Sequence, residues 1–256
     1  MSDSSVIEAV DVRKDYGHVS ALRGASIAVK GGEIVALVGD NGAGKSTLLK
    51  SMCGAVSPDS GEIRILGERV VFASIRAAHA LGVQTVYQDL ALAPDLSVPD
   101  NIFLGVEELR DGPLRRFGVL ARRRMAADAS ESLEALGIKL PSVKVPVSSL
   151  SGGQLQAVAI ARAIRWARTA LLMDEPTAAL GVAQTEIVVE TIRRAADRGL
   201  GVLLVSHDMP RMLGLAHRIV VLRHGTVVGD IPGDTATIPQ IVSVMLGAEV
   251  ANGRAE

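Results

Sequence analysis

A glycine-rich segment directly after a short apolar run constrains the fold of this chain more than any other feature. It fits the pattern G-x-x-x-x-G-K-[ST]. Its residues are Gly39, Asp40, Asn41, Gly42, Ala43, Gly44, Lys45 and Ser46. Glycines let the backbone curl so that successive N–H groups converge on phosphate oxygens, and a helix that starts there adds the partial positive charge of its N-terminus. In this pattern Lys45 reaches the terminal phosphates and the Ser46 hydroxyl binds Mg²⁺.

The surroundings of this segment favour a nucleotide site over a chance glycine-rich turn. The apolar run Ile34–Val38 precedes it, and Leu48, Leu49 and Met52 follow at the spacing of a buried helix face. A strand, a loop and a helix in that order are the context that the motif requires. We therefore expect the chain from Gly39 to Thr47 to surround the phosphates of a nucleotide.

Five short apolar runs predict a mostly parallel sheet. Each is too short for a helix, and most are almost continuously apolar, as strands covered on both faces are. The runs are Ile34–Val38, Val83–Val86, Ala170–Met173, Val202–Val205 and Ile219–Leu222. Helical patterns lie between them, with Val182–Arg198 the longest, so the fold class is α/β.

Two further regions differ from this core. Val6–Val12 and Ser26–Val29 are typical of antiparallel strands and predict an N-terminal antiparallel β subdomain. Residues of roughly 90–165 have weaker strand signals and predict a helical insertion, in which Met125–Leu136 forms a helix. A last helix is expected at Ile238–Leu246, before a polar tail. We expect residues 1–256 to form one domain.

Composition excludes several classes of protein. Lys and Arg total 27 against 28 Asp and Glu, and this near-neutrality argues against a general nucleic-acid binder. The single cysteine, Cys53, excludes an internal disulfide framework and a four-cysteine zinc site. No apolar run approaches the ~20 residues of a transmembrane helix, so we expect a soluble, intracellular protein.

Two carboxylates end one of the apolar runs. Asp174 and Glu175 follow Ala170–Met173, and a parallel strand delivers such residues to the sheet edge where ligands bind. Asp174 is then placed to orient Mg²⁺, and Glu175 to act as general base on the water that attacks the γ-phosphate. Solvated acids at a strand end are the alternative, which the neighbouring glycine-rich loop disfavours.

A third motif opens the helix expected at Leu155–Trp166. It consists of Leu150, Ser151, Gly152, Gly153 and Gln154. Ser151 and Gln154 fit a capping box, but two glycines in a first helical turn each cost about 1 kcal/mol relative to alanine. Bare backbone at a helix N-terminus suits the close approach of an anion, so we expect a second phosphate-contacting surface here.

Together, the glycine-rich loop, Leu150–Gln154 and Leu171–Pro176 resemble an ATP-binding-cassette (ABC) ATPase subunit. The resemblance extends from Tyr16 to about Gly229, and the LSGGQ sequence separates this family from other P-loop enzymes. It implies a P-loop NTPase fold with ATP and Mg²⁺ as cofactors. It also implies that Tyr16 stacks on adenine, that Gln88 senses Mg²⁺ and the transmembrane partner, and that His207 contacts the γ-phosphate.

The resemblance implies partners as well. In this family the LSGGQ segment completes the ATP site of a second subunit, so a homodimer is expected. Transmembrane permease subunits and, indirectly, an extracytoplasmic sugar-binding protein are the other expected partners, with this chain on the cytoplasmic face of the membrane. No nucleic-acid partner is expected.

One departure from the family bears on the substrate. After the two acids, this chain continues with Pro176 and Thr177 and then with Ala178-Ala179-Leu180-Gly181, whereas the family commonly has Ser-Ala-Leu-Asp at these last four positions. The missing aspartate leaves the signalling role of that loop open. The same stretch resembles ATPases of monosaccharide importers of the ribose, xylose and fructose type. The alternatives are an importer of another solute and a soluble ABC ATPase acting on nucleic acid or the ribosome.

The segment Arg110–Arg124 contains six arginines and one aspartate. It is predicted to be a solvated loop and helix face; contact with lipid headgroups or an acidic partner is the alternative.

Overall fold

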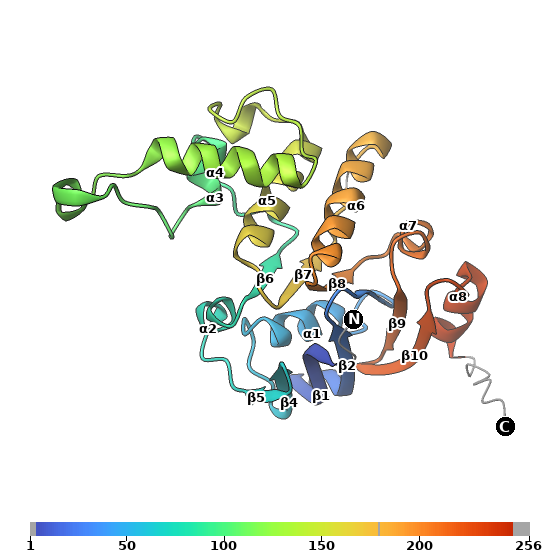
Figure 1. The fold of residues 1–256 in the computed structure, drawn as a ribbon. Helices are drawn as coiled ribbons and strands as arrows, with labels where there is room; N and C mark the ends of the chain where they lie inside the picture. The colour runs from blue at the N-terminus through green and yellow to red at the C-terminus, as the bar shows by residue number, and fades with distance from the viewer. Residues whose placement is uncertain (1–3, 179, 248–256) are drawn as a thin grey trace.

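A six-stranded sheet carries the glycine-rich loop in the computed structural model, which describes residues 4–178 and 180–247 (Figure 1). The strand order is β10–β9–β3–β8–β7–β6. The strands are β3(Ile34–Val38), β6(Val83–Val86), β7(Ala170–Asp174), β8(Gly201–Val205), β9(Arg218–Arg223) and β10(Thr226–Pro232). All neighbours pair in parallel except β10, which is antiparallel to β9. The five predicted strands are confirmed to within one residue at each end.

Strand β3 lies inside the sheet and is buried along its whole length. Its alternate residues face two separate cores, with Ala36 in one and Val35 in the other. A strand covered on both faces needs no polar positions, which explains the continuous apolar run.

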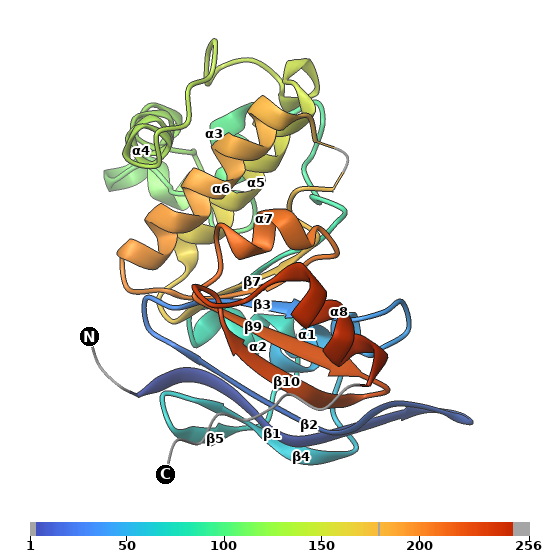
Figure 2. The same cartoon turned by 90° about the vertical axis from the view of Figure 1, so that its right-hand side faces the viewer.

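The N-terminal strands form a second, antiparallel sheet of order β2–β1–β4–β5. Its strands are β1(Ser5–Tyr16), β2(Val19–Lys30), β4(Ser60–Ile65) and β5(Glu68–Val70). Helix α1(Lys45–Met52) lies between this sheet and the six-stranded one (Figure 2). The antiparallel sheet was predicted, but β1 and β2 are longer than expected and β4 and β5 have no counterpart in the prediction.

The remaining helices are α2(Ile75–Ala80), α3(Val98–Ile102), α4(Arg122–Ala135), α5(Gly152–Trp166), α6(Val182–Asp197), α7(Met209–Leu213) and α8(Ile238–Leu246), with short 3-10 turns at Gly112–Phe117 and Val147–Ser149. Helices α5 and α6 cover the other face of the six-stranded sheet, and α3 and α4 pack on α5 farther from the sheet (Figure 2). Helix α2 lies beside β6, with Ala78 in the core that α1 shares, and α8 lies against β9 and β10.

The predicted helices over α4, α5, α6 and α8 are confirmed. The apolar residues of α6 alone predict Ile187, Val188 and Ile192 on its buried face. In the structure Ile187 is 39% exposed, and Thr185 and Thr191 fill that face beside Val188 and Ile192.

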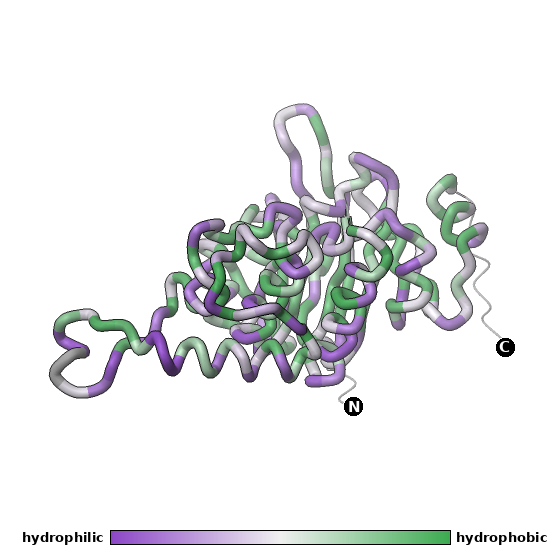
Figure 3. The backbone as a smooth tube through the Cα atoms, turned by 90° about the horizontal axis from the view of Figure 1, so that it is seen from above, coloured by the Kyte–Doolittle hydropathy of each residue, from purple (hydrophilic) through white to green (hydrophobic). Residues whose placement is uncertain are grey.

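The segment between α3 and α4 extends away from the rest of the molecule (Figure 1 and Figure 3). It contains much of the arginine-rich stretch. Two of those arginines pair locally, Arg122 with Asp100 at 3.9 Å and Arg124 with Glu108 at 3.2 Å. In the part of the chain that the structure describes, no helix has the length and apolar character needed to cross a membrane.

Candidate nucleotide-binding site

The carboxyl ends of four parallel strands bring the predicted site residues together. Strand β3 leads into the glycine-rich loop, β6 into Gln88, β7 ends at Asp174, and β8 ends next to Ser206 and His207. A cavity of about 430 Å³ lies at this edge. It is lined by Tyr16, Val19, Ala21, Asn41, Gly42, Ala43, Gly44, Lys45, Ser46, Thr47, Gln88, Asp174, Glu175 and Val205. Ligand binding at this edge is the general behaviour of open α/β sheets.

Two glycines of the loop are required by its path through the fold. Gly39 has φ +154°, and a Cβ there would lie 2.1 Å from the carbonyl oxygen of Leu222. Gly44 has φ +107°, and its Cβ would lie 2.4 Å from the carbonyl oxygen of Ala21. Any side chain at either position would displace the loop from β2 or β9, because the obstructing atoms belong to the backbone.

The Lys45 ammonium group is held by the loop itself. Its Nζ donates hydrogen bonds to the carbonyl oxygens of Gly39 at 2.7 Å and Asp40 at 2.9 Å. Burial lowers the pKa of Lys45, and the nearby carboxylates of Glu175, Asp40 and Asp174 partly oppose that shift. A half-buried ammonium group beside the loop is suited to bind the terminal phosphates of a nucleotide through charge-assisted hydrogen bonds.

Glu175 and His207 meet although they come from different strands. The Glu175 Oε1 atom lies 2.9 Å from Nδ1 of His207. Glu175 has a left-handed backbone, with φ +52°, and its N–H donates to the carbonyl oxygen of Val205 at 2.9 Å. The Glu175 side chain is 18% exposed, whereas His207 is 74% exposed and does not line the cavity. Strained backbone is kept where the surrounding structure imposes it, typically at functional sites.

The oxygen donors expected to bind Mg²⁺ all line the cavity: the Ser46 hydroxyl, the Gln88 side-chain amide and the Asp174 carboxylate. Among the described residues, no cluster of three or more His, Cys, Asp or Glu could hold a metal. One carboxylate, one hydroxyl and one amide oxygen fit Mg²⁺, which binds through one or two carboxylates together with substrate phosphates.

The predicted second phosphate-contacting segment lies apart from this cavity, because none of Ser151, Gly152, Gly153 or Gln154 lines it. The capping box is present: the Ser151 hydroxyl accepts from the Gln154 N–H at 3.4 Å, and Gln154 Oε1 accepts from the Ser151 N–H at 3.0 Å. The capping box that Ser151 and Gln154 predict is therefore confirmed, and it forms with both glycines in the first turn.

The two glycines differ in what surrounds them. Gly153 is buried, and a Cβ there would lie 2.5 Å from Cβ of Gln184 in α6, so its small size has a packing reason. Gly152 is exposed, and the nearest atom to its Cβ would be Leu180 Cδ2 at 3.8 Å. Only Gly152 is left without a structural reason within this chain.

Gly181 occupies the position where the aspartate is missing, and Ala179 lies outside the described residues. The Gly181 N–H donates to Oε1 of Gln184 at 3.2 Å, so Gln184 satisfies the backbone at the start of α6. Gln184 thus contacts both the end of this loop and Gly153.

Three residues that line the cavity were not among the predicted site residues: Val19, Ala21 and Val205. The first two lie on β2, beside Tyr16, which pairs with Val19 across a tight turn at Gly17 and His18. The predicted strands end at Val12 and begin again at Ser26, so they do not include this end of the β1–β2 hairpin. Gly17, which has φ +59°, is the turn signal in the sequence that marks it.

A phosphate-binding loop at the end of an inner parallel strand, with acids at the end of another strand of the same sheet, defines the class of P-loop nucleoside triphosphatases. The family can be stated as well. The family model described as ABC transporter matches residues 22–178, and the chain belongs to this family. It is therefore an ABC ATPase domain, which binds ATP.

Similar proteins cover nearly the whole chain. The xylose/arabinose import ATP-binding protein of Sulfolobus acidocaldarius is 42% identical over 94% of this chain and 94% of its own length. The fructose import ATP-binding protein of Rhizobium meliloti is 42% identical over 97% of this chain and 96% of its own. A ribose import ATP-binding protein of Streptomyces avermitilis is 37% identical, and the match covers 44% of its length.

Solved structures show the same fold. A nucleotide-free ATP-binding cassette from an ABC transporter superposes with TM-score 0.81 at 22% identity, over 95% of this chain and all of the other. A dimeric cassette bound to ADP and phosphate superposes with TM-score 0.74 at 25% identity, over 90% of this chain and all of the other.

Proposed function

We propose that this chain hydrolyses ATP to drive a bacterial importer for a monosaccharide, working as a homodimer on separate transmembrane permease subunits. The contact that carries the proposal is the 2.9 Å approach of Glu175 to His207 at the cavity that also holds Lys45. The substrate class rests on relatives of the same length whose names state xylose/arabinose and fructose import.

The residues have the following proposed roles in ATP binding. The loop backbone from Gly39 to Thr47 surrounds the phosphates, and Lys45 neutralises the terminal ones. Tyr16 stacks on the adenine; it lines the cavity and is 47% exposed, so its ring is accessible to a base. Asp40, Asn41, Gly42, Ala43 and Gly44 contribute through the loop backbone.

Hydrolysis follows from the position of Glu175. Its carboxylate accepts a proton from water as the water oxygen bonds to the γ-phosphorus, and the bond from that phosphorus to the bridging oxygen of ADP breaks. With a proton on each ring nitrogen, His207 donates from Nδ1 to Glu175, which holds the base in place, and from Nε2 to the γ-phosphate. Ser46, Gln88 and Asp174 would hold Mg²⁺, which supplies charge neutralisation on the phosphates.

The signature segment acts on the neighbouring subunit in this proposal. Ser151, Gly152, Gly153 and Gln154 do not line the cavity of their own chain, and Ser151 and Gly152 are exposed. A second copy would bring these N–H groups against its partner's nucleotide, so two chains enclose two ATP molecules. The dimeric neighbour with ADP and phosphate supports such pairing.

The transport function implies two further kinds of partner, a permease and a sugar-binding protein. The chain would lie at the cytoplasmic face of the membrane, bound to the permease, and an extracytoplasmic sugar-binding protein would deliver the substrate. We do not propose a nucleic-acid partner.

The test measures ATPase activity of the chain assembled with the permease in vesicles and supplied with single monosaccharides and the sugar-binding protein. We expect one sugar, or a few related ones, to stimulate turnover of the wild-type complex and not of a Glu175→Gln complex. Turnover that no monosaccharide changes would overturn the substrate class, and an unaffected Glu175→Gln complex would overturn the site.

A further inference from the structure

Arg162, in the C-terminal half of α5, binds the loop that carries Gln88. Its Nη1 donates to the carbonyl oxygen of Ala91 at 2.8 Å, and its Nη2 donates to the carbonyl oxygen of Leu90 at 2.8 Å. A guanidinium that binds two neighbouring carbonyls fixes both the position and the orientation of the loop.

The loop has a conformation that needs such support. Ala91 is in the left-handed region, with φ +48°, and its N–H donates to the Asp89 side chain at 3.3 Å. Alanine adopts this backbone only where the surroundings impose it. The two carbonyls that Arg162 binds lie at and next to this turn, two and three residues after Gln88.

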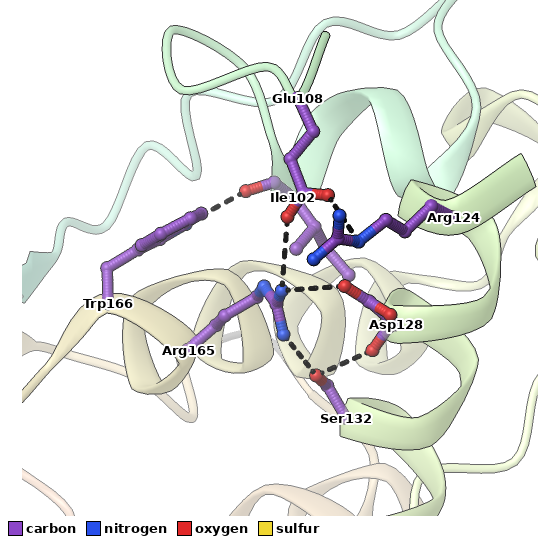
Figure 4. A network of polar contacts seen from close by, with 7 residues as sticks. All are labelled: Ile102, Glu108, Arg124, Asp128, Ser132, Arg165 and Trp166. Atoms are coloured by element: carbon purple, nitrogen blue, oxygen red, sulfur yellow. Dashed lines mark hydrogen bonds and ion pairs between the residues drawn. The ribbon is translucent and has the colours of Figure 1, made fainter. Parts of the chain in front are cut away.

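Among the described residues, no carboxylate pairs with Arg162. Burial lowers its pKa. Within residues 4–178 and 180–247, the two loop carbonyls are therefore the hydrogen-bond partners of its guanidinium group. Arg165, one turn further along α5, differs: it lies 3.3 Å from Asp128, 3.2 Å from Ser132 and 3.9 Å from Glu108, all outside the Gln88 loop (Figure 4).

The other side of Gln88 is attached to a different part of the molecule. The hydroxyl of Tyr87 lies 3.4 Å from Sγ of Cys53, at the end of α1, the helix that begins at Lys45. Gln88 thus lies between an attachment to the phosphate-binding helix and an attachment to α5, whose first turn carries Gly152 and Gly153.

We infer that Arg162 is a positioning residue that ties the Gln88 loop to α5, so that Gln88 and the Ser151–Gln154 turn change position together. A displacement of α5 is transmitted through the two carbonyls to Gln88 in the ATP cavity. The inference rests on the role proposed above for Gln88. It adds the side chain through which that role depends on α5.

The test compares Arg162→Met and Arg162→Lys with the matched pair Arg165→Met and Arg165→Lys in the full-length chain. Methionine keeps much of the side-chain length but has no hydrogen-bond donor. Lysine keeps the positive charge but lacks the planar guanidinium group, whose two terminal nitrogens bind the two carbonyls. The assays are steady-state hydrolysis of ATP against Mg²⁺ concentration, and equilibrium binding of ATP. Melting temperature monitors the fold of all variants. The fluorescence of Trp166, the single tryptophan, serves only for the Arg162 pair, because Cζ of Arg165 lies 5.4 Å from the centre of the Trp166 ring.

We expect Arg162→Met to lower kcat by about tenfold or more, since small displacements of positioned groups have effects of this size. ATP affinity should change less than about twofold, because the phosphate-binding loop is untouched. The Mg²⁺ concentration for half-maximal activity should rise. Arg162→Lys should be intermediate, and the Arg165 variants should lower melting temperature without moving the Mg²⁺ dependence.

A double-mutant cycle with Gln88→Ala decides whether Arg162 acts through Gln88. Adding Arg162→Met to Gln88→Ala should cause little further loss, because the group it positions is already gone. Additive losses, or Arg162 and Arg165 variants with the same kinetic profile, would overturn the inference. If Arg162→Met does not fold, the double-mutant cycle with Gln88→Ala is measured with Arg162→Lys instead. An inactive wild-type chain, or a fully active Glu175→Gln variant, would overturn the proposed function instead.

Discussion

The ATP cavity and the signature segment of this chain are built in opposite ways. The cavity gathers residues from β1, β2, the glycine-rich loop, the Gln88 loop, β7 and β8. The signature segment is local, a single capped turn at the start of α5, with Ser151 and Gly152 exposed. A site assembled from many strands can bind a nucleotide alone, whereas an exposed helix start needs a second surface to act on. This difference supports the proposed pairing, in which the signature segment of one copy acts on the nucleotide held in the cavity of the other.

The largest effect is expected from Glu175→Gln, which removes the base and keeps the shape of the cavity. We predict that kcat falls by ~10²–10⁴-fold, the usual contribution of a positioned general base, while ATP still binds. Measured ATP hydrolysis and equilibrium nucleotide binding check this. Glu186→Gln, at an exposed position on α6, is the matched control and should be unchanged. Hydrolysis at the wild-type rate would exclude Glu175 as the base.

Lys45→Ala tests the cavity as a binding site. Charge-assisted hydrogen bonds to the phosphates are lost, so we predict ATP binding weaker by the equivalent of about 1.5–3 kcal/mol, and very low turnover. Isothermal titration with ATP measures this directly. Lys50→Ala, on the exposed side of the same helix, should bind ATP normally. Equal affinities of the two variants would contradict the phosphate role of Lys45.

The two signature glycines separate function from packing. Gly152→Ala has room for its Cβ, so we predict an unchanged or slightly higher melting temperature together with reduced ATP turnover. Gly153→Ala places its Cβ 2.5 Å from Cβ of Gln184, and we predict destabilisation by about 1–3 kcal/mol. Thermal unfolding and ATPase assays on both variants check this. A Gly152→Ala variant with full turnover would remove the argument for an anion at that backbone.

The smallest effect is expected from Ser151→Ala, which removes the helix cap and leaves the backbone in place. We predict a loss of ~1 kcal/mol in the free energy of unfolding, measured by urea denaturation. Ser151→Thr keeps a capping oxygen and should recover most of that loss. A loss far above 1 kcal/mol would mean that Ser151 supports more than the first turn of α5.

The sequence predicts the inner strands well because each is covered on both faces and therefore continuously apolar, as in β3 and β8. It predicts poorly where strands are partly exposed. Strands β4 and β5 carry charged residues such as Glu62, Arg64 and Glu68. The pairing of β4 with β1 joins segments that are far apart in the chain, and β5 pairs in turn with β4. The same reason explains Ile187, whose exposure depends on what α6 packs against.

What the sequence by itself determined are the local motifs: the glycine-rich loop, the strand ending at Asp174 and Glu175, and the LSGGQ turn. These follow from short-range geometry, in which spacing alone fixes what neighbouring residues can do. Only the tertiary structure decided the contact of Glu175 with His207, the packing of Gly153 on Gln184 and the attachment of Arg162 to Leu90 and Ala91. Each joins segments that are far apart in the chain, and the packing of strands and helices, which no local pattern encodes, brings them within reach.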